Sequence, residues 1–156
     1  MRTRMRTFLL FVFFTISEIA AGQDVDPAMK SLIESGNFIF KLQSVSPMKG
    51  GFIPQNPGYS VTMSKDTVDC FLPYFGRIYN PSYASSDSGL KFVSTRFEKE
   101  TEARKKGGWN INLKFRDTKN VSKMMFTTFE NGKTTISVIC KDRETISYSG
   151  YIEKRK

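Results

Sequence analysis

The strongest constraint on the fold of this chain is an alternation of apolar and polar residues over one short segment. Residues 109–116 read WNINLKFR, so the apolar side chains fall on one face of an extended backbone and the polar side chains on the other. Successive side chains of a strand point to opposite faces of a sheet, and the segment therefore predicts a β-strand with one buried and one solvated face. Such strands are typical of antiparallel sheets, which can expose one face to water.

Turn signals divide the rest of the chain into further strands. Asn131-Gly132 is the strongest short hairpin signal, and a second hairpin is expected across Lys65-Asp66. The Gly- and Pro-rich residues 47–58 and the charged, helix-prone residues 98–108 are expected to lie outside the strands. We predict strands at residues 38–43, 59–63, 67–72, 90–97, 109–116, 124–130, 133–140 and 145–152.

One helix is expected before the first strand. Apolar residues recur at helical spacing from Val25, with Asp26 at the N-cap, Pro27 in the first turn and Gly36 at the C-terminus. The predicted fold is mainly β (α+β), an antiparallel meander of about eight strands that could curl towards a barrel. The helix of residues 27–35 would pack across one face or end of the sheet.

The first 22 residues have the three-part layout of a secretory signal peptide. Arginines at positions 2, 4 and 6 precede the apolar run FLLFVFFTI at residues 8–16, and small residues lead up to the Gly22–Gln23 bond. An uncleaved anchor is the alternative, but the run falls short of the about 20 apolar residues that span a bilayer. We expect cleavage near Gly22–Gln23, a periplasmic or secreted protein, a single β-rich domain at residues 23–156, and no transmembrane span in the mature form.

Charge and the absence of histidine restrict the chemistry. The chain has a net charge of +9; the leader carries +2, from three Arg and one Glu, so +7 remains on residues 23–156. A basic exported protein favours envelope polyanions over nucleic acid, although such a charge also serves solubility alone. The chain has no His, the commonest general base and metal ligand, so we expect no metal and no cofactor.

The two cysteines of the chain allow one disulfide, and the sequence does not decide whether it forms. Cys70 and Cys140 lie in apolar, strand-like segments, and an oxidising compartment would allow them to pair. Each is equally explained as a small buried hydrophobe. The sequence alone does not place the two strands side by side.

A corner rich in aromatic residues is the candidate contact site. A predicted strand ends at Pro73 and leads into a segment with an arginine and three tyrosines. Exposed Tyr and Arg are typical of binding surfaces, whereas in the alternative interpretation the aromatic side chains fill the core and Pro73 and Gly76 shape the corner. The predicted contact residues are Tyr74, Arg77, Tyr79 and Tyr83.

The same corner carries a family resemblance. LPYFGR at residues 72–77 resembles the signature of the bacterial DUF4251 family of exported proteins. YSVTMSKDTVDC before it, and GLKF, GWNINLKF and FENGKTTISVICKDRETISYSGYI after it, agree in order and spacing over about residues 52–152. The resemblance implies a small, β-rich, exported or envelope-associated protein with an N-terminal helix and no assigned activity. Some members carry a lipobox cysteine, which this chain lacks.

These features favour a non-enzymatic binding or envelope-support module. Its partner would be an envelope polyanion, a glycan or another envelope protein. The alternative is a His-free hydrolase of envelope polysaccharide, which needs two carboxylates about 5–9.5 Å apart across a cleft. Its candidate acids are Asp69, Asp87, Glu98 and Asp117. A purely structural or inhibitory protein is a third interpretation.

Overall fold

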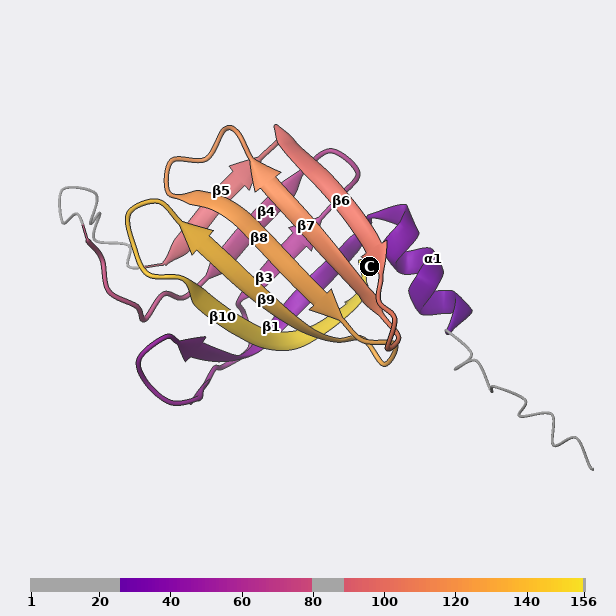
Figure 1. Cartoon of the computed structure of the whole chain (residues 1–156), viewed down its shortest axis with the longest axis horizontal. Helices are drawn as coiled ribbons and strands as arrows, with labels where there is room; N and C mark the ends of the chain where they lie inside the picture. Colours follow the sequence, from indigo (N-terminus) through magenta and orange to yellow (C-terminus); the bar gives the residue numbers. More distant parts are fainter. Residues whose placement is uncertain (1–25, 80–88, 156) are drawn as a thin grey trace, which may run out of the picture.

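The computed structural model describes residues 26–79 and 89–155, and in these ranges it has one helix and a ten-stranded antiparallel sheet (Figure 1). The helix is α1 (Pro27–Ser35). The strands are β1 (Phe38–Pro47), β2 (Ile53–Pro54), β3 (Ser60–Met63), β4 (Val68–Leu72), β5 (Leu90–Ser94), β6 (Phe97–Ala103), β7 (Trp109–Phe115), β8 (Val121–Thr128), β9 (Lys133–Cys140) and β10 (Ile146–Lys154).

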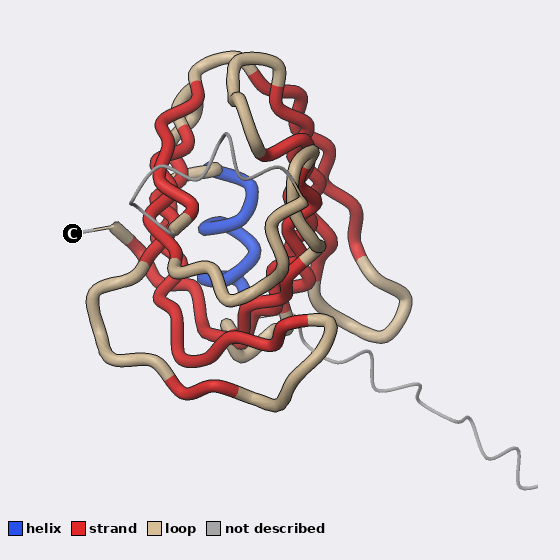
Figure 2. The backbone as a smooth tube through the Cα atoms, turned by 90° about the vertical axis from the view of Figure 1, so that its left-hand side faces the viewer, coloured by secondary structure: helices blue, strands red, loops and turns tan. Residues whose placement is uncertain are grey.

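The sheet curls until it is nearly closed into a barrel (Figure 2). Its strand order is β5-β4-β3-β1-β10-β9-β8-β7-β6, with β2 paired to β1 beside this path. Most neighbours are consecutive hairpins, as the meander predicts. The exception is β1, which lies between β3 and β10, so that the first and last strands along the chain are neighbours in the sheet. The mainly β, antiparallel fold with one helix is therefore confirmed.

Local sequence signals place several elements correctly. The helix begins and ends where the pattern predicts: the Asp26 carboxylate accepts a hydrogen bond from the Ala28 amide at 3.0 Å, and Gly36 is left-handed at φ 65°. The hairpin of β8 and β9 turns at Asn131-Gly132, where Gly132 has φ 78°. Strand β7 buries every second residue, as its alternation predicts.

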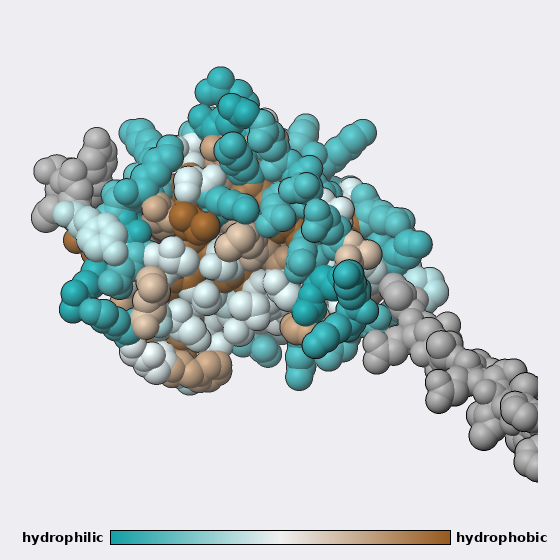
Figure 3. All heavy atoms as spheres, viewed as in Figure 1, coloured by the Kyte–Doolittle hydropathy of each residue, from teal (hydrophilic) through white to brown (hydrophobic). Residues whose placement is uncertain are grey.

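The prediction was wrong for residues 90–108, which were expected to form one strand and a charged, helix-prone tip. The strand stops at Ser94, and residues 97–103 form β6, paired to β7 from Phe97↔Phe115 to Ala103↔Trp109. Helix propensity is a weak prior, and here the neighbouring strand overrides it. All the charged residues of β6 are exposed, and Figure 3 shows hydrophilic side chains gathered over this part of the sheet. The predicted loop at 47–58 likewise contains the short strand β2.

The barrel interior is filled by the alternating apolar residues of the strands. Phe38, Phe40, Phe126 and Tyr148 are among the largest fully buried side chains. Helix α1 lies at one end of the barrel, where Figure 2 shows it through the ring of strands, and its Ile33 is fully buried. Within the described residues, no helix has the length and apolar character needed to cross a membrane.

The corner between the two edge strands is held by one carboxylate. Asp117 accepts hydrogen bonds from the backbone amides of Thr95 at 2.9 Å and Arg96 at 3.0 Å, and from the hydroxyl of Ser94 at 2.5 Å. These bonds lower the pKa of the Asp117 carboxyl, the Ser94 contact most. They tie the β5–β6 corner to the end of β7.

Candidate functional site

The segment after β4 crosses the end of the barrel opposite α1, which we call the mouth. Ile78 forms an antiparallel bridge with Arg143, the Tyr79 amide donates to the Asp142 carbonyl at 2.8 Å, and the Glu144 amide donates to the Arg77 carbonyl at 2.9 Å. In the sheet, β3, β1 and β10 separate β4 from β9, so these bonds connect two distant walls. They place the predicted corner at the mouth.

Tyr74 is buried within this crossing. Its side chain is 6% exposed, and its hydroxyl lies 2.8 Å from the Glu144 carbonyl and 3.0 Å from the Arg77 carbonyl. Burial raises the pKa of the Tyr74 phenol, so the hydroxyl stays protonated and can donate. Tyr74 therefore fastens the crossing to the β9–β10 loop.

The other corner residues divide between packing and exposure. Pro73 accepts a 2.7 Å hydrogen bond from the buried Tyr148 hydroxyl, and a Cβ at Gly76 would lie 2.4 Å from the Tyr74 hydroxyl. Arg77 is exposed and Tyr79 is 67% exposed. Tyr83 lies outside the described residues. Contact by Tyr74, Arg77, Tyr79 and Tyr83 stays a prediction, for which Arg77 and Tyr79 present free surface.

Both cysteines are free thiols. Their strands, β4 and β9, are not neighbours in the sheet. Burial raises the pKa of Cys140 to about 11 and raises that of Cys70 further, so both stay protonated at neutral pH. A Cys70–Cys140 disulfide was one of two interpretations of the sequence, and in the structure the two cysteines are not bonded.

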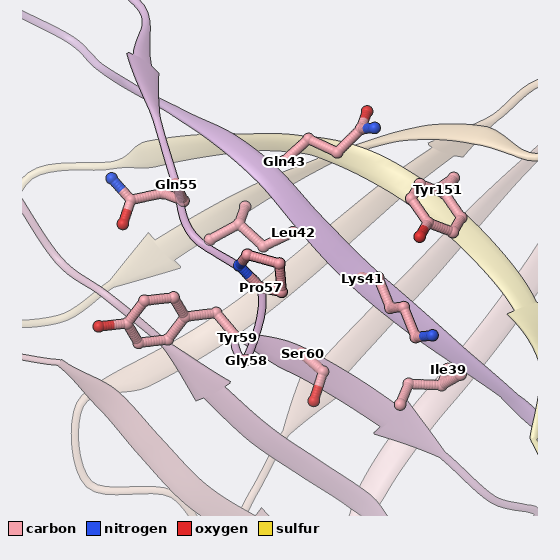
Figure 4. Close-up of a pocket in the computed structure, with 10 residues that line it drawn as sticks. All are labelled: Ile39, Lys41, Leu42, Gln43, Gln55, Pro57, Gly58, Tyr59, Ser60 and Tyr151. Carbon is pink, nitrogen blue, oxygen red and sulfur yellow. The ribbon is translucent and has the colours of Figure 1, made fainter.

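A second candidate site, which we call the bulge pocket, lies on the outer surface of the barrel (Figure 4). The β1–β10 register shifts between Leu42 and Ser44, leaving Gln43 as the extra residue of a β-bulge. The chain between β2 and β3 bows away from β1 here and is tied back by two backbone bonds, from Gln55 to Gln43 and from Leu42 to Tyr59. The result is a cavity of about 620 Å³.

The bulge pocket combines flat rings with neutral hydrogen-bonding groups. Figure 4 shows Tyr59 and Tyr151 at its two sides, with Leu42 and Pro57 between them. The amides of Gln43 and Gln55 and the hydroxyl of Ser60 add donors and acceptors. This mixture of apolar surface and a few polar groups is typical of small-molecule sites.

Among the described residues that line the bulge pocket, the single charged side chain is already paired. Lys41 forms an ion pair with Glu153 of β10. The hydrogen bond to Glu153 is the main reason that the pKa of Lys41 is raised, so the ammonium is held in its charged form. This lysine has no tendency to act as a general base at neutral pH.

Sequence reasoning missed the bulge pocket because it treated residues 47–58 as a connecting loop. The bulge leaves a one-residue slip in the alternation between Leu42 and Val45, but this slip coincides with the end of the strand predicted at residues 38–43. The usable signal was the length of the connection together with the tyrosine that follows Gly58.

The candidate hydrolytic acids do not converge. Asp69 is exposed on β4, Glu98 pairs with Arg116, and Asp117 is occupied at the β5–β6 corner. The Arg116 hydrogen bond lowers the pKa of Glu98, which is opposite to the shift a general acid needs. Asp87 lies outside the described residues.

Comparisons with known proteins agree on one family. The family model described as "Domain of unknown function (DUF4251)" matches residues 22–152. A crystal structure of a DUF4251 family protein from Bacteroides eggerthii DSM 20697 superposes with a TM-score of 0.58 at 12% sequence identity, covering 80% of this chain and 84% of that one. At this identity the likeness concerns the fold. No curated protein matches the chain.

Proposed function

The chain belongs to the DUF4251 family, a domain family of unknown function, and from this premise we propose that it is an exported, non-enzymatic module that binds a neutral glycan. Export rests on the layout of residues 1–22. The observation that carries the binding function is the bulge pocket, with its two tyrosine rings and its neutral side chains.

The chemistry of the bulge pocket favours a glycan. A sugar ring offers an apolar face of C–H groups, which matches an aromatic side chain, and hydroxyls at its edge, which match amides. Tyr151 on β10 and Gln43 at the bulge are held by paired strands, so the pocket is largely formed before a ligand arrives. An acidic glycan is a poorer fit, because the Lys41 charge is neutralised by Glu153.

Binding is favoured over hydrolysis by the state of the titratable groups. A hydrolase needs one carboxyl with a raised pKa facing a second carboxylate. Glu98 and Asp117 both have lowered pKa values, and none of the described residues that line the bulge pocket is a carboxylate.

Export is tested by the N-terminus of the protein recovered from cells. We expect a chain that begins at Gln23 in the periplasmic or culture fraction, identified by intact mass and N-terminal sequencing. Replacing Leu10 by lysine breaks the apolar run and should hold the uncleaved chain in the cytoplasm. Recovery of the unmodified chain in the cytosol, still beginning at Met1, would contradict export.

Glycan binding is tested by titrating the purified protein with neutral oligosaccharides of glucose, xylose and N-acetylglucosamine in a calorimeter. Removal of the Tyr151 ring by Tyr151→Ala should weaken the best of these ligands at least about tenfold, the equivalent of one stacking contact of about 1.4 kcal/mol. Gln43→Ala should weaken the same ligand through a lost hydrogen bond.

Tyr79→Ala is the matched control, because it deletes an exposed tyrosine at the barrel mouth instead of the bulge pocket. It should leave glycan affinity unchanged. If Tyr79→Ala abolished binding and Tyr151→Ala did not, the predicted contact corner would be the glycan site and the bulge pocket would be excluded. No heat with any neutral sugar would overturn the proposed ligand class.

A further inference from the structure

Arg143 is a buried cation with an unused hydrogen-bond donor. It lies in the β9–β10 loop at the mouth and is 5% exposed. Its Nε and Nη2 each lie 3.3 Å from an oxygen of Asp142, and its guanidinium stacks over the Tyr74 ring at 4.9 Å from the centroid. Its Nη1 is buried and has no hydrogen-bond partner among residues 26–79 and 89–155. Buried polar groups are normally satisfied, and a charged donor left unpaired is costly.

Arg143 lines a cavity of about 320 Å³ at the mouth. The start of β5 forms one wall, from Gly89 to Phe92, and the β7–β8 loop forms the other, from Asp117 to Val121. This cavity is separate from the bulge pocket and shares no lining residue with it. The cavity is large enough for several water molecules, since one water molecule occupies about 30 Å³ in the liquid.

Donor side chains in the lining of this cavity come from three chain segments, and one of them, Lys91 of β5, lies over the Phe71 ring at 5.8 Å from its centroid. Arg143 comes from the β9–β10 loop, while Lys119 and Asn120 come from the β7–β8 loop. Lys119 is exposed. The ammonium of Lys141 lies 3.3 Å from the Thr118 carbonyl, which adds a further positive charge beside the same loop.

The acids nearby are already engaged. Asp142 is paired with Arg143, and both oxygens of Asp117 accept hydrogen bonds from the β5–β6 corner. A carboxylate oxygen of Glu144 lies 3.4 Å from the Arg77 amide that it faces. These carboxylates stay charged, but the described lining of the cavity carries three cations, Lys91, Lys119 and Arg143, against one carboxylate, Asp117, so its net charge is positive.

We propose that this cavity, which we call the mouth pocket, binds an oxyanion group, a phosphate or sulfate, through Arg143 Nη1, Lys119 and Asn120. A guanidinium and an ammonium are the side chains that hold such groups most strongly. Asp142 and Tyr74 position the guanidinium so that little side-chain entropy is lost on binding. The proposal is independent of the glycan site, because the two pockets lie on different parts of the barrel.

The first test titrates isotope-labelled protein with inorganic phosphate and with inorganic sulfate, following the backbone amide signals by NMR at constant ionic strength held with chloride. Saturable shifts at Thr118 to Val121 and at Arg143, with millimolar or tighter affinity, are expected. Acetate is the planar comparison and should bind at least threefold more weakly. Shifts that chloride alone reproduces would overturn the proposal.

Variants assign the contact to particular side chains. Lys119→Ala should weaken phosphate binding three- to tenfold, whereas Lys106→Ala, which removes an exposed lysine at the opposite end of the barrel, should not. Arg143→Lys keeps a cation beside Asp142 but loses the planar guanidinium with its several fixed donors, and it should weaken phosphate binding at least tenfold. Arg143→Gln removes the cation that pairs with Asp142, so the NMR spectrum is used first to check that this variant folds.

Two outcomes contradict the mouth pocket directly. Equal effects of Lys119→Ala and Lys106→Ala would reduce the interaction to general attraction by a basic protein. Full phosphate affinity in a folded Arg143→Lys variant would remove the guanidinium from the site. Tyr151→Ala should leave phosphate binding unchanged, so failure of the glycan proposal is distinguishable from failure of this one.

Discussion

Replacement of Gly150 by alanine is expected to destabilise the protein by at least about 3 kcal/mol, at or beyond the upper end of the usual cost of overpacking. Gly150 lies in β10 opposite Leu42, at the bulge of β1. A Cβ there would lie 2.0 Å from the Lys41 carbonyl oxygen and 2.9 Å from Cζ of Phe40. Backbone cannot yield as a flexible side chain does, so β1 and β10 would have to separate. Urea denaturation followed by the fluorescence of Trp109, the one tryptophan of the chain, measures the loss.

Gly51→Ala is the matched control for Gly150. It adds the same methyl group where no atom lies within 4 Å of the new Cβ. Stability should stay the same or rise by up to about 1 kcal/mol, because alanine restricts the unfolded chain. Equal unfolding midpoints for the two variants would mean that β1 and β10 do not approach each other as the structure has them.

The sequence was sufficient where one element carries its own signal. The alternation in Trp109–Phe115 and the turn at Asn131-Gly132 are local, and so are the caps of α1. Each decides a backbone conformation within a few residues. These signals predicted an antiparallel, mainly β fold because hairpin neighbours are usually consecutive strands.

The contacts that complete the barrel are not local. The pairing of β1 with β10 runs from Phe38↔Lys154 to Pro47↔Ile146, residues about 100 or more positions apart, and neither segment carries a local signal that identifies its partner strand. Strand β6 shows the same limit, since its charged sequence reads as a helix until β7 is present beside it. The secondary structure of such segments depends on their position in the sheet more than on the intrinsic propensity of their residues.

The two pockets needed the same long-range information. Residues Gln43 and Tyr151 meet at the bulge pocket only because β1 lies beside β10. Arg143 lies between the strands predicted at residues 133–140 and 145–152, and it is buried because the crossing of residues 77–79 packs against it. For Tyr74 the sequence allowed either an exposed contact residue or a buried packing residue. The structure buries its ring beneath the guanidinium of Arg143.

Truncation of Phe38 to alanine is the second large effect, with an expected loss of about 3–5 kcal/mol of unfolding free energy. Phe38 is fully buried at the start of β1, where it faces Met63 in β3 and Lys154 in β10. Its ring meets Phe126 edge to face, with centroids 6.2 Å apart. Alanine would leave a cavity between both walls of the barrel. Urea or thermal unfolding measures the change, with circular dichroism to show that the variant still folds.

Phe52→Ala removes the same side chain from the β1–β2 connection, where Phe52 is 68% exposed. Its effect on stability should stay within about 0.5 kcal/mol. The contrast isolates burial, because composition, charge and the deleted atoms are identical in the two variants. A Phe38 variant as stable as the Phe52 variant would mean that β1 does not lie between β3 and β10. Both pockets would then lose the strand pairing on which their geometry depends, since β1 supplies the bulge and β10 continues from the loop that carries Arg143.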